Sequence, residues 1–293
     1  MNDLEKVKRD GLMIQYIEDQ TEELCLEALM QNGLALKYIE NQTEELCEKA
    51  ISNDPLALKY VKEQTPDLCH LAVSDNGYAL EYVKERTDDL RLTAVRNVAY
   101  ALEYMDASEI TEEIAIAAVE KRGWALSLVP NKTEAICIAA IRDNIDVIRD
   151  IPNDLLTEAV CIAAVEKNGL VLGSIRARVG DSLQEGTCVI SPLGCVNTCI
   201  AAVKQNGCAL GAVDIQTEEM CLIAVRQNGY ALRYVKDQTV EICLEAVNNP
   251  VFEAQKNLLL PDRLDFIRDQ EIRDRVTQIT EGKRFMKTKS ARR

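Results

Sequence analysis

Cysteine is the residue type in this chain with the most chemistry open to it, because a thiolate can bind a metal ion, form a disulfide or act as a nucleophile. The chain has 11 cysteines, an odd number. Eight of them recur at one place of a repeating apolar pattern: Cys25, Cys47, Cys69, Cys137, Cys161, Cys199, Cys221 and Cys243. Free cysteine in an apolar stripe is typical of a small core residue. We therefore predict that these eight thiols are buried and are not metal ligands.

A second group of cysteines is closer together in the sequence. Four thiols fall within 21 residues, at Cys188, Cys195, Cys199 and Cys208. Structural zinc is usually bound by closely spaced pairs of cysteines, and only Cys195 and Cys199 form such a pair. Zinc therefore stays open only as a minor alternative, and we expect neither a metal nor a cofactor.

Nucleophilic and acid–base catalysis has little to build on here. His70 is the only histidine, and most other copies of the repeat carry leucine or isoleucine at its place, so we interpret it as a substitute for an apolar side chain. Acidic pairs such as Glu22-Glu23 follow a threonine, where they suit the positive end of a helix dipole. No glycine-rich phosphate loop, H-E-x-x-H or G-x-S-x-G motif is present. We expect no catalytic residue and no enzyme, with carboxylate-only catalysis as a minor alternative.

The elements that position these residues are repeats of about 22 residues. Numbered from its threonine, the unit reads Thr-Glu-Glu-Leu-Cys-Leu-x-Ala-Val-x-x-Asn-Gly-Tyr-Ala-Leu-x-Tyr-Val-Lys-Glu-Gln, most clearly in 21–42, 65–86 and 217–238. Position 8 is alanine in all ten copies: Ala28, Ala50, Ala72, Ala94, Ala118, Ala140, Ala164, Ala202, Ala224 and Ala246. Repetition at this period is typical of a stacked array. We interpret the alanine as a contact too close for any larger side chain.

Each repeat is predicted to form two short helices. Threonine is a preferred N-cap, and apolar residues at positions 4, 5, 8 and 9 give one helical stripe. Asn-Gly at positions 12 and 13 is expected to end this helix in a left-handed conformation, and apolar positions 15, 16 and 19 predict a second helix. The expected fold is all-α, an α-solenoid of about ten stacked 22-residue helix-turn-helix repeats. A leucine-rich horseshoe needs a different leucine register and is the minor alternative.

The repeat array is expected to cover residues 1–260. It opens with a partial repeat at 4–20 and is interrupted by an insertion loop at about 177–193, which contains Gly180, Gly186 and Ser191-Pro192. Residues 261–280 are predicted to form a C-terminal capping helix, since terminal repeats need a polar outer face. A basic tail at 281–293 follows and is predicted to be disordered.

Tyrosine at positions 14 and 18 is the pattern that most suggests binding. These candidate partner-binding residues are Tyr38, Tyr60, Tyr78, Tyr82, Tyr100, Tyr104, Tyr230 and Tyr234. The two positions are spaced as neighbours on one helix face, and stacking would align them into a ladder. Either the rings pad contacts between repeats, or part of the ladder binds a partner protein. Because the pattern fades in the middle of the chain, we expect the first four repeats to be the better candidate.

The composition limits the kinds of partner. The formal net charge is −14, which disfavours binding to nucleic acid or anionic lipid. Nucleic acid remains an option only through the basic tail at 283–293. The sequence shows neither a secretion signal nor an apolar run long enough for a membrane span. We therefore expect no membrane partner and a reducing, cytoplasmic location.

The consensus Thr-x-Glu-Leu-Cys-Leu-x-Ala-Val-x-Gln-Asn-Gly-x-Ala-Leu-x-Tyr-Val resembles a repeat family of unknown function found in amoeba-infecting giant viruses and in intracellular bacteria of amoebae. The resemblance covers roughly residues 4–250. It implies an α-helical solenoid and brings no activity or catalytic residues with it. We expect a protein-interaction scaffold of viral or effector type, in the host cytoplasm or the virion. A structural component of a particle is the alternative, and an enzyme or a nucleic-acid adaptor acting through the tail is a second one.

Overall fold

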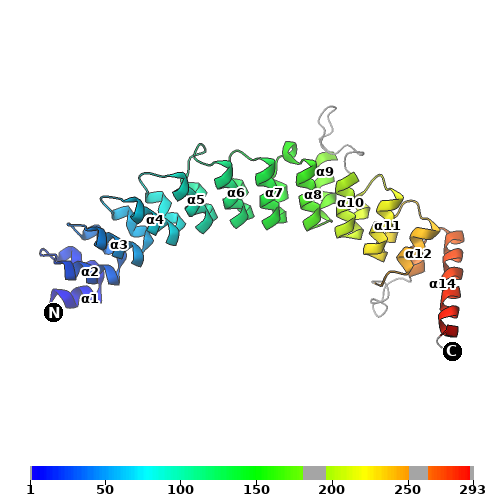
Figure 1. Cartoon of the computed structure of the whole chain (residues 1–293), viewed down its shortest axis with the longest axis horizontal. Helices are drawn as coiled ribbons and strands as arrows, with labels where there is room; N and C mark the ends of the chain where they lie inside the picture. Colours follow the sequence, from blue (N-terminus) through cyan, green and yellow to red (C-terminus); the bar gives the residue numbers. More distant parts are fainter. Residues whose placement is uncertain (1, 181–195, 251–262, 291–293) are drawn as a thin grey trace. The chain divides into compact units, whose positions relative to one another are not determined.

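The computed structural model describes residues 2–180, 196–250 and 263–290. All regular structure in these ranges is helical, without a strand, which confirms the all-α prediction. The chain divides into two compact units, Met1–Asp150 (unit 1) and Ile151–Arg293 (unit 2), and each is a helical repeat solenoid (Figure 1). No described helix is long and apolar enough to cross a membrane.

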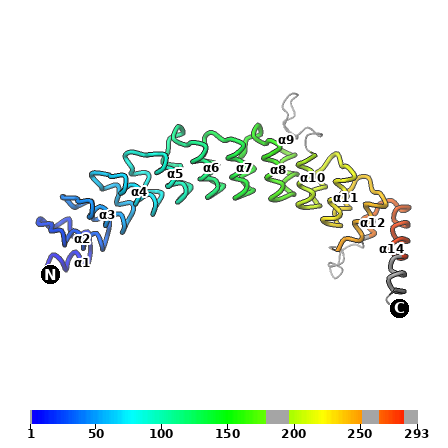
Figure 2. The backbone as a smooth tube through the Cα atoms, in the orientation of Figure 1, coloured from blue at the N-terminus to red at the C-terminus, as the bar shows by residue number. Residues whose placement is uncertain are grey.

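Unit 1 alternates ten-residue α-helices with six-residue 3-10 helices, after a shorter first helix. Its backbone follows the same course in each repeat (Figure 2). The elements are α1 (Asp3–Arg9), η1 (Gly11–Tyr16), α2 (Glu22–Gln31), η2 (Gly33–Tyr38), α3 (Glu44–Asn53), η3 (Pro55–Tyr60), α4 (Pro66–Asp75), η4 (Gly77–Tyr82), α5 (Asp88–Asn97), η5 (Ala99–Tyr104), α6 (Glu112–Lys121), η6 (Gly123–Leu128), α7 (Glu134–Asp143) and η7 (Ile145–Asp150).

Unit 2 continues the same alternation with two departures. The elements are η8 (Asn153–Leu155), α8 (Glu158–Lys167), α9 (Val171–Gly180), α10 (Val196–Gln205), η9 (Gly207–Ala212), α11 (Glu218–Gln227), η10 (Gly229–Tyr234), α12 (Val240–Val247), η11 (Arg263–Phe266) and α14 (Gln270–Ser290). The α-helix α9 stands where other repeats have a 3-10 helix. The predicted insertion at 177–193 lies mostly outside the described residues, and α8 packs directly against α10 across it.

Threonine begins the first helix of the repeats as predicted. The Thr43 hydroxyl oxygen accepts a hydrogen bond from the Leu46 amide at 3.3 Å, and the same bond starts α4 at Thr65. A threonine side chain in this role satisfies one of the amides that a helix leaves unpaired at its start. The apolar stripe that follows is buried, as Leu46 and Cys47 are 3% and 4% exposed.

The second segment of most repeats is a 3-10 helix, and our expectation of a helix end in left-handed Asn-Gly is wrong. Asn32 is extended, with φ −154° and ψ 109°, and its side-chain oxygen accepts from the Leu34 amide at 3.0 Å. Asn32 is therefore the C-cap of α2, through its amide bond to the Ala28 carbonyl at 2.9 Å, and also the N-cap of η2. The segment has six residues, and a 3-10 helix is the form in which such short pieces commonly occur.

Where position 13 is glycine, packing between repeats leaves no room for a side chain. A Cβ atom on Gly33 would lie 2.3 Å from the carbonyl oxygen of Ala50 in the next repeat. The same approach, at 2.3 to 2.7 Å, joins Gly11 to Ala28, Gly77 to Ala94, Gly123 to Ala140, Gly169 to Ala202 and Gly207 to Ala224. All ten position-8 alanines are fully buried. The backbone of one repeat thus rests directly on the backbone of the next.

The tenth repeat is completed by η11, after the residues 251–262 that lie outside the described ranges. Gln238 donates to the Phe266 carbonyl at 2.9 Å, as Gln42 does to Tyr60 at 3.0 Å. Helix α14 then begins at an N-cap, where the Asp269 side chain accepts from the Ile272 amide at 3.0 Å. The helix runs to Ser290, so the prediction of a disordered tail is wrong for residues 281–290.

Candidate interaction surface

The 3-10 helices of unit 1 pack side by side and carry a row of aromatic and leucine side chains. Neighbouring helices from η1 to η6 are in contact. We call the side chains at positions 14 and 18 of these helices the aromatic ridge; it includes Tyr16, Leu34, Tyr38, Leu56, Tyr60, Tyr78, Tyr82, Tyr100, Tyr104 and Trp124. The fold thus places six of the eight predicted tyrosines on one unit. Tyr230 and Tyr234 belong to η10 of unit 2.

The ridge is only partly covered by neighbouring atoms. Tyr78 is 40% exposed, Tyr100 38% and Trp124 46%, whereas Tyr38 and Tyr60 are half-buried. Trp124 was missing from our candidates because we looked for tyrosine alone. It occupies position 14 of the fifth repeat, so aligning that repeat by position would have found it.

The ring contacts run between repeats rather than within one helix. Tyr78 and Tyr104 meet edge to face, with ring centroids 6.2 Å apart. Tyr230 and Phe266 form the equivalent contact in unit 2 at 5.8 Å. In a 3-10 helix residues three apart are aligned, so positions 14 and 18 of one segment diverge, unlike in the α-helix we predicted. Position 14 of one repeat instead meets position 18 of the next.

Charged residues at position 17 lie beside these rings. The Lys37 ammonium lies 5.2 Å from the centre of the Tyr38 ring, and Lys59 lies 4.8 Å from Tyr60 and 5.8 Å from Tyr82. These are cation–π distances. The third and fourth repeats have Glu81 and Glu103 at this position instead.

The two carboxylates affect the tyrosine hydroxyls near them. A hydrogen bond to Glu81, together with partial burial, raises the pKa of Tyr82 above its usual value. Partial burial and the charges of Glu81 and Glu103 raise the pKa of Tyr104. Both phenols are therefore protonated at neutral pH and can donate hydrogen bonds.

Where position 22 is glutamine, its side chain fixes one 3-10 helix to the next. The Gln42 amide nitrogen donates to the Leu36 carbonyl at 3.2 Å and to the Tyr60 carbonyl at 3.0 Å, and its oxygen accepts from the Lys62 amide at 3.0 Å. The same three contacts recur at Gln20, Gln64, Gln216 and Gln238. These bonds satisfy backbone groups that a short helix leaves unpaired. Our sequence reasoning gave this glutamine no role.

A polar residue at position 11 makes a second link between repeats. The Asn53 side chain accepts from the Gly33 amide at 2.8 Å and donates to the Met30 carbonyl at 3.0 Å. The equivalent acceptors for a position-13 glycine are Asn97, Asp143, Gln205 and Gln227. Two side-chain links and one backbone contact therefore hold the ridge in register.

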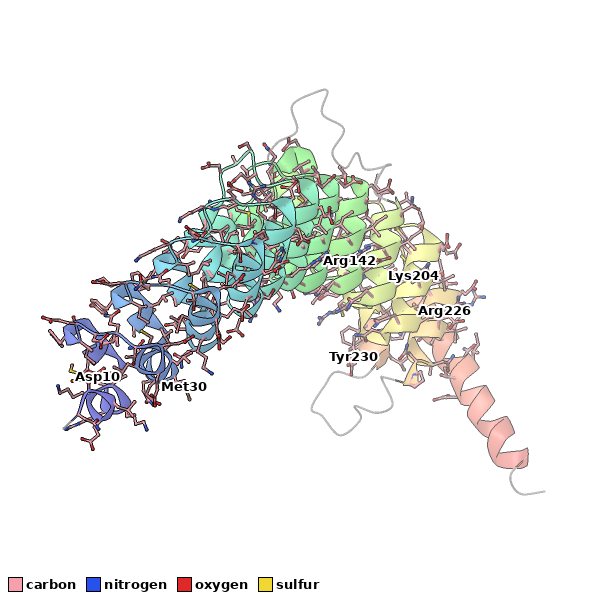
Figure 3. The ribbon with its side chains drawn as sticks, turned by 60° about the vertical axis from the view of Figure 1, so that its left-hand side comes forward. Asp10, Met30, Arg142, Lys204, Arg226 and Tyr230 are labelled. Atoms are coloured by element: carbon pink, nitrogen blue, oxygen red, sulfur yellow. The ribbon has the colours of Figure 1, made fainter. Side chains whose placement is uncertain are left out.

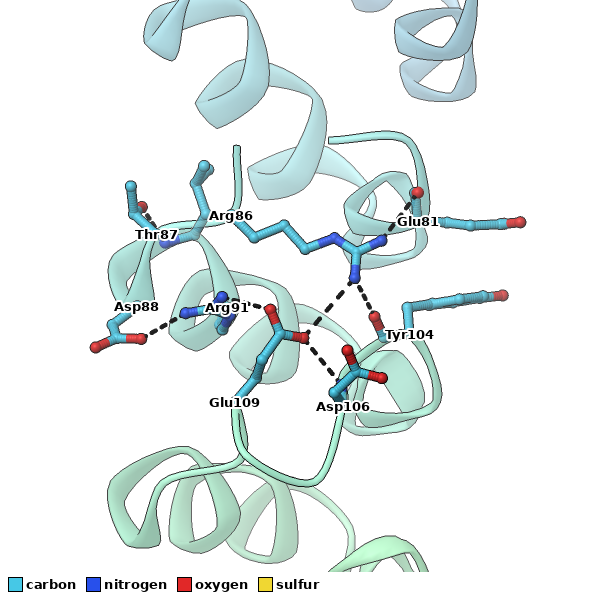
Figure 4. Close-up of polar contacts among 9 residues, drawn as sticks. Glu81, Arg86, Thr87, Asp88, Arg91, Tyr104, Asp106 and Glu109 are labelled. Atoms are coloured by element: carbon cyan, nitrogen blue, oxygen red, sulfur yellow. Dashed lines mark hydrogen bonds and ion pairs between the residues drawn. The ribbon is translucent and has the colours of Figure 1, made fainter. Parts of the chain in front are cut away.

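The junction between the third and fourth repeats replaces the neutral link with charges (Figure 4). Arg86 stands in place of the glutamine and donates to the Tyr104 carbonyl, and Arg91 stands in place of the cysteine. The Glu109 carboxylate lies between them, 2.5 Å from Arg91 and 3.9 Å from Arg86. A hydrogen bond from the Asp106 amide and the two arginines hold the pKa of Glu109 below its usual value, against a smaller opposing effect of burial.

The cysteines lie where the sequence placed them, so far as they are described. All eight predicted core cysteines are buried, and burial raises the pKa of Cys161 and of Cys243 to about 11. Cys208 is half-buried, and Cys188 and Cys195 lie outside the described residues. Within the described ranges, no cluster of three or more His, Cys, Asp or Glu side chains could hold a metal ion.

The surroundings of His70 are more polar than we predicted. Its side chain is 41% exposed, and its Nε2 atom lies 3.3 Å from the Asp89 carboxylate in the next repeat. The site has no second base or nucleophile bonded to this histidine among the described residues. We assign it a surface contact between repeats.

Position 10 of the α-helices forms another exposed row (Figure 3). In unit 1 it includes Met30, which is 54% exposed. In unit 2 it includes Lys204 on α10 and Arg226 on α11, and Arg226 pairs with Glu245 at 3.2 Å. The residue type changes from one repeat to the next, so this row is a weaker candidate than the aromatic ridge.

The fold and its repeated contacts define a helical repeat protein. A family model described as a domain of unknown function (DUF4116) matches residues 21–66, which span the first two repeats. The match supports the coarser part of the resemblance, an uncharacterised repeat family. No curated protein and no solved structure matches the chain.

Proposed function

We propose that this chain is a non-enzymatic scaffold that binds another protein through the aromatic ridge of unit 1. The exposure of Tyr78, Tyr100 and Trp124 on adjoining helices is the observation that carries the proposal. The resemblance of the repeats supports a scaffold of viral or effector type acting in a host cytoplasm.

The physical support is that the ridge combines aromatic area with a fixed backbone. Tyrosine and tryptophan are the residues most enriched among those that dominate binding energy, because they bury a large area with few rotatable bonds. The glutamine links hold η1 to η4 in register, and Arg86 takes this role between η4 and η5. A surface that is ordered before binding loses less conformational entropy when a partner arrives.

Affinity capture with a tagged full-length chain tests the proposal. We expect a stoichiometric partner that is lost when Tyr100→Ala and Trp124→Ala are combined. The matched control combines Met30→Ala and Leu71→Ala, which remove two exposed apolar side chains, 54% and 39% exposed, from the α-helices. Equal thermal melting temperatures would show that both variants fold.

The outcomes separate the proposal from its alternatives. Retention of the partner by the ridge variant, or equal loss in both variants, would overturn it. Recovery of the chain only with particle proteins, unaffected by the ridge variant, would favour a structural component instead.

A further inference from the structure

The charge of the side chains beside the aromatic ridge changes from positive to negative along unit 1. In the first two repeats position 17 is lysine, and the ammonium groups of Lys37 and Lys59 lie over tyrosine rings. In the third and fourth repeats the same position is Glu81 and Glu103. The chain itself shows, in its first two repeats, that the faces of these rings accept a cation.

Several rings beyond Lys59 have no cation over them. Within the described residues, no lysine or arginine lies over Tyr78, Tyr100, Tyr104 or Trp124. Glu81 and Glu103 form no ion pair there either. These six residues, which we call the acidic aromatic patch, therefore combine rings that no described cation covers with carboxylates that form no described ion pair.

Two cations near Glu81 in the sequence are bonded to other groups. The Lys84 ammonium donates to the Lys62 carbonyl at 2.8 Å, within the link between repeats. Arg86 is held by the Tyr104 carbonyl and by Glu109. Neither of these two cations pairs with Glu81 or Glu103, which leaves both carboxylates open to a cation from another molecule.

We propose that the acidic aromatic patch binds an arginine- or lysine-bearing segment of the partner protein, whose cations occupy the ring faces and pair with Glu81 and Glu103. This inference rests on the proposed function and names the chemistry of the partner. Arginine suits the site best, because its planar group stacks on rings and forms two parallel bonds to a carboxylate. The net charge of −14 attracts such a segment from a distance.

A labelled peptide of alternating arginine and glycine serves as the probe, and its binding is measured by fluorescence anisotropy. The control peptide carries citrulline, which keeps the shape of arginine without its charge. We expect the citrulline peptide to bind at least about ten-fold more weakly, because it loses both the cation–π contacts and the ion pairs. Equal binding of the two peptides would overturn the proposal.

Two charge-matched variants show whether the attraction is local. Combining Glu81→Gln with Glu103→Gln changes the net charge from −14 to −12, and so does combining Glu48→Gln with Glu120→Gln on exposed α-helix positions. We expect the first variant to weaken binding about three- to ten-fold and the second less than about two-fold. Equal weakening would reduce the effect to net charge and would overturn the proposal.

The partner recovered by affinity capture separates this inference from the proposed function. If the Tyr100→Ala and Trp124→Ala variant loses the partner while the Glu81→Gln and Glu103→Gln variant keeps it, the scaffold stands and the basic segment is refuted. If the ridge variant keeps the partner, the proposed function itself fails. If both variants lose it, both proposals are supported.

Discussion

Replacement of Gly33 by alanine tests whether backbone contact between repeats determines the glycine. The added Cβ would lie 2.3 Å from the Ala50 carbonyl oxygen and 3.0 Å from the Asp54 amide nitrogen. Both neighbours are backbone atoms at the end of a helix, so no side chain can rotate away. Relief requires the two repeats to separate by roughly 1 Å, since unstrained carbon contacts are longer by about that amount.

The expected change in the free energy of unfolding combines two destabilising effects and one stabilising effect. Overpacking of a tight contact costs about 1–3 kcal/mol. Separation of the repeats also lengthens the 2.8 Å bond from the Gly33 amide to Asn53, which adds about 1 kcal/mol. Alanine restricts the unfolded chain, which returns about 0.4–1 kcal/mol. We expect Gly33→Ala to lower the free energy of unfolding by about 1–3 kcal/mol.

The chain supplies its own control in Gly282, which lies in helix α14, where an added Cβ meets no described atom within 4 Å beyond the backbone of its own helix. There alanine should stabilise by about 0.5–1 kcal/mol, because glycine is unfavourable inside a helix. Urea denaturation measures both variants, and hydrogen exchange of the Asp54 amide, which is bonded to Ala50 at 2.9 Å, reports the junction locally. If the two variants differ by less than about 0.5 kcal/mol and Asp54 exchange is unchanged, the packing argument is refuted.

Three further predictions concern the links, the charged cluster and the thiols. Gln42→Leu removes three hydrogen bonds and should lower the free energy of unfolding, measured in urea, by about 2–3 kcal/mol. The control Gln31→Leu loses only a bond to Glu27 and should be nearly neutral. Equal effects of the two variants would contradict the role of the glutamine link. The folded-state pKa of Glu109 is lowered, so its stabilisation is present above its unfolded pKa of about 4.3 and is lost as the pH falls through the folded value. Thermal melts should therefore show that Glu109→Gln destabilises at pH 7 and that the difference shrinks in acid, and a difference independent of pH would contradict this. In a Cys188→Ser and Cys195→Ser background nine of the 11 thiols remain, and Ellman's reagent at pH 8 should react quickly with Cys208 alone, the other eight requiring denaturant; uniform fast reaction would contradict their burial.

The α-helical half of the repeat could be predicted because its signals are local and strong. Threonine followed by an acidic pair gives the helix start, and the stripe through Cys47 and Ala50 gives the buried face. These features depend on neighbours within one turn or two of the same helix. The register of the whole array followed from them, since every copy repeats them.

The 3-10 half was harder because its geometry is set by contacts between repeats. A six-residue segment such as 33–38 has too few apolar positions to distinguish a period of three from one of 3.6. Asn-Gly is ambiguous as well, since the same pair can close a helix or can bring a bare backbone against a neighbour. Gln42 acts on Tyr60 and Lys62 in the following repeat, and nothing in its own repeat reveals that partner.

The pairing of residues about 20 positions apart was nevertheless present in the sequence. Gly33 is followed by its acceptor Asn53, and Gly77 by Asn97. The fourth repeat instead has Ala99, and the corresponding residue of the fifth is Lys121, which cannot accept a hydrogen bond. At this junction the glycine and the acceptor are both absent, whereas the second repeat has Pro55 and is followed by Asp75, which can still accept a bond.

The fourth repeat also carries part of the acidic aromatic patch. The contacts between repeats therefore affect the surface that we propose binds the partner. Arg86 binds the carbonyl of Tyr104, the residue whose ring meets Tyr78 on the ridge. The position of that ring therefore depends on an arginine paired with Glu109, where other repeats use a neutral glutamine. Protonation of Glu109 weakens this support, whereas the glutamine links do not titrate. Acid should therefore loosen the ridge first at Tyr104, before the repeats on either side of it.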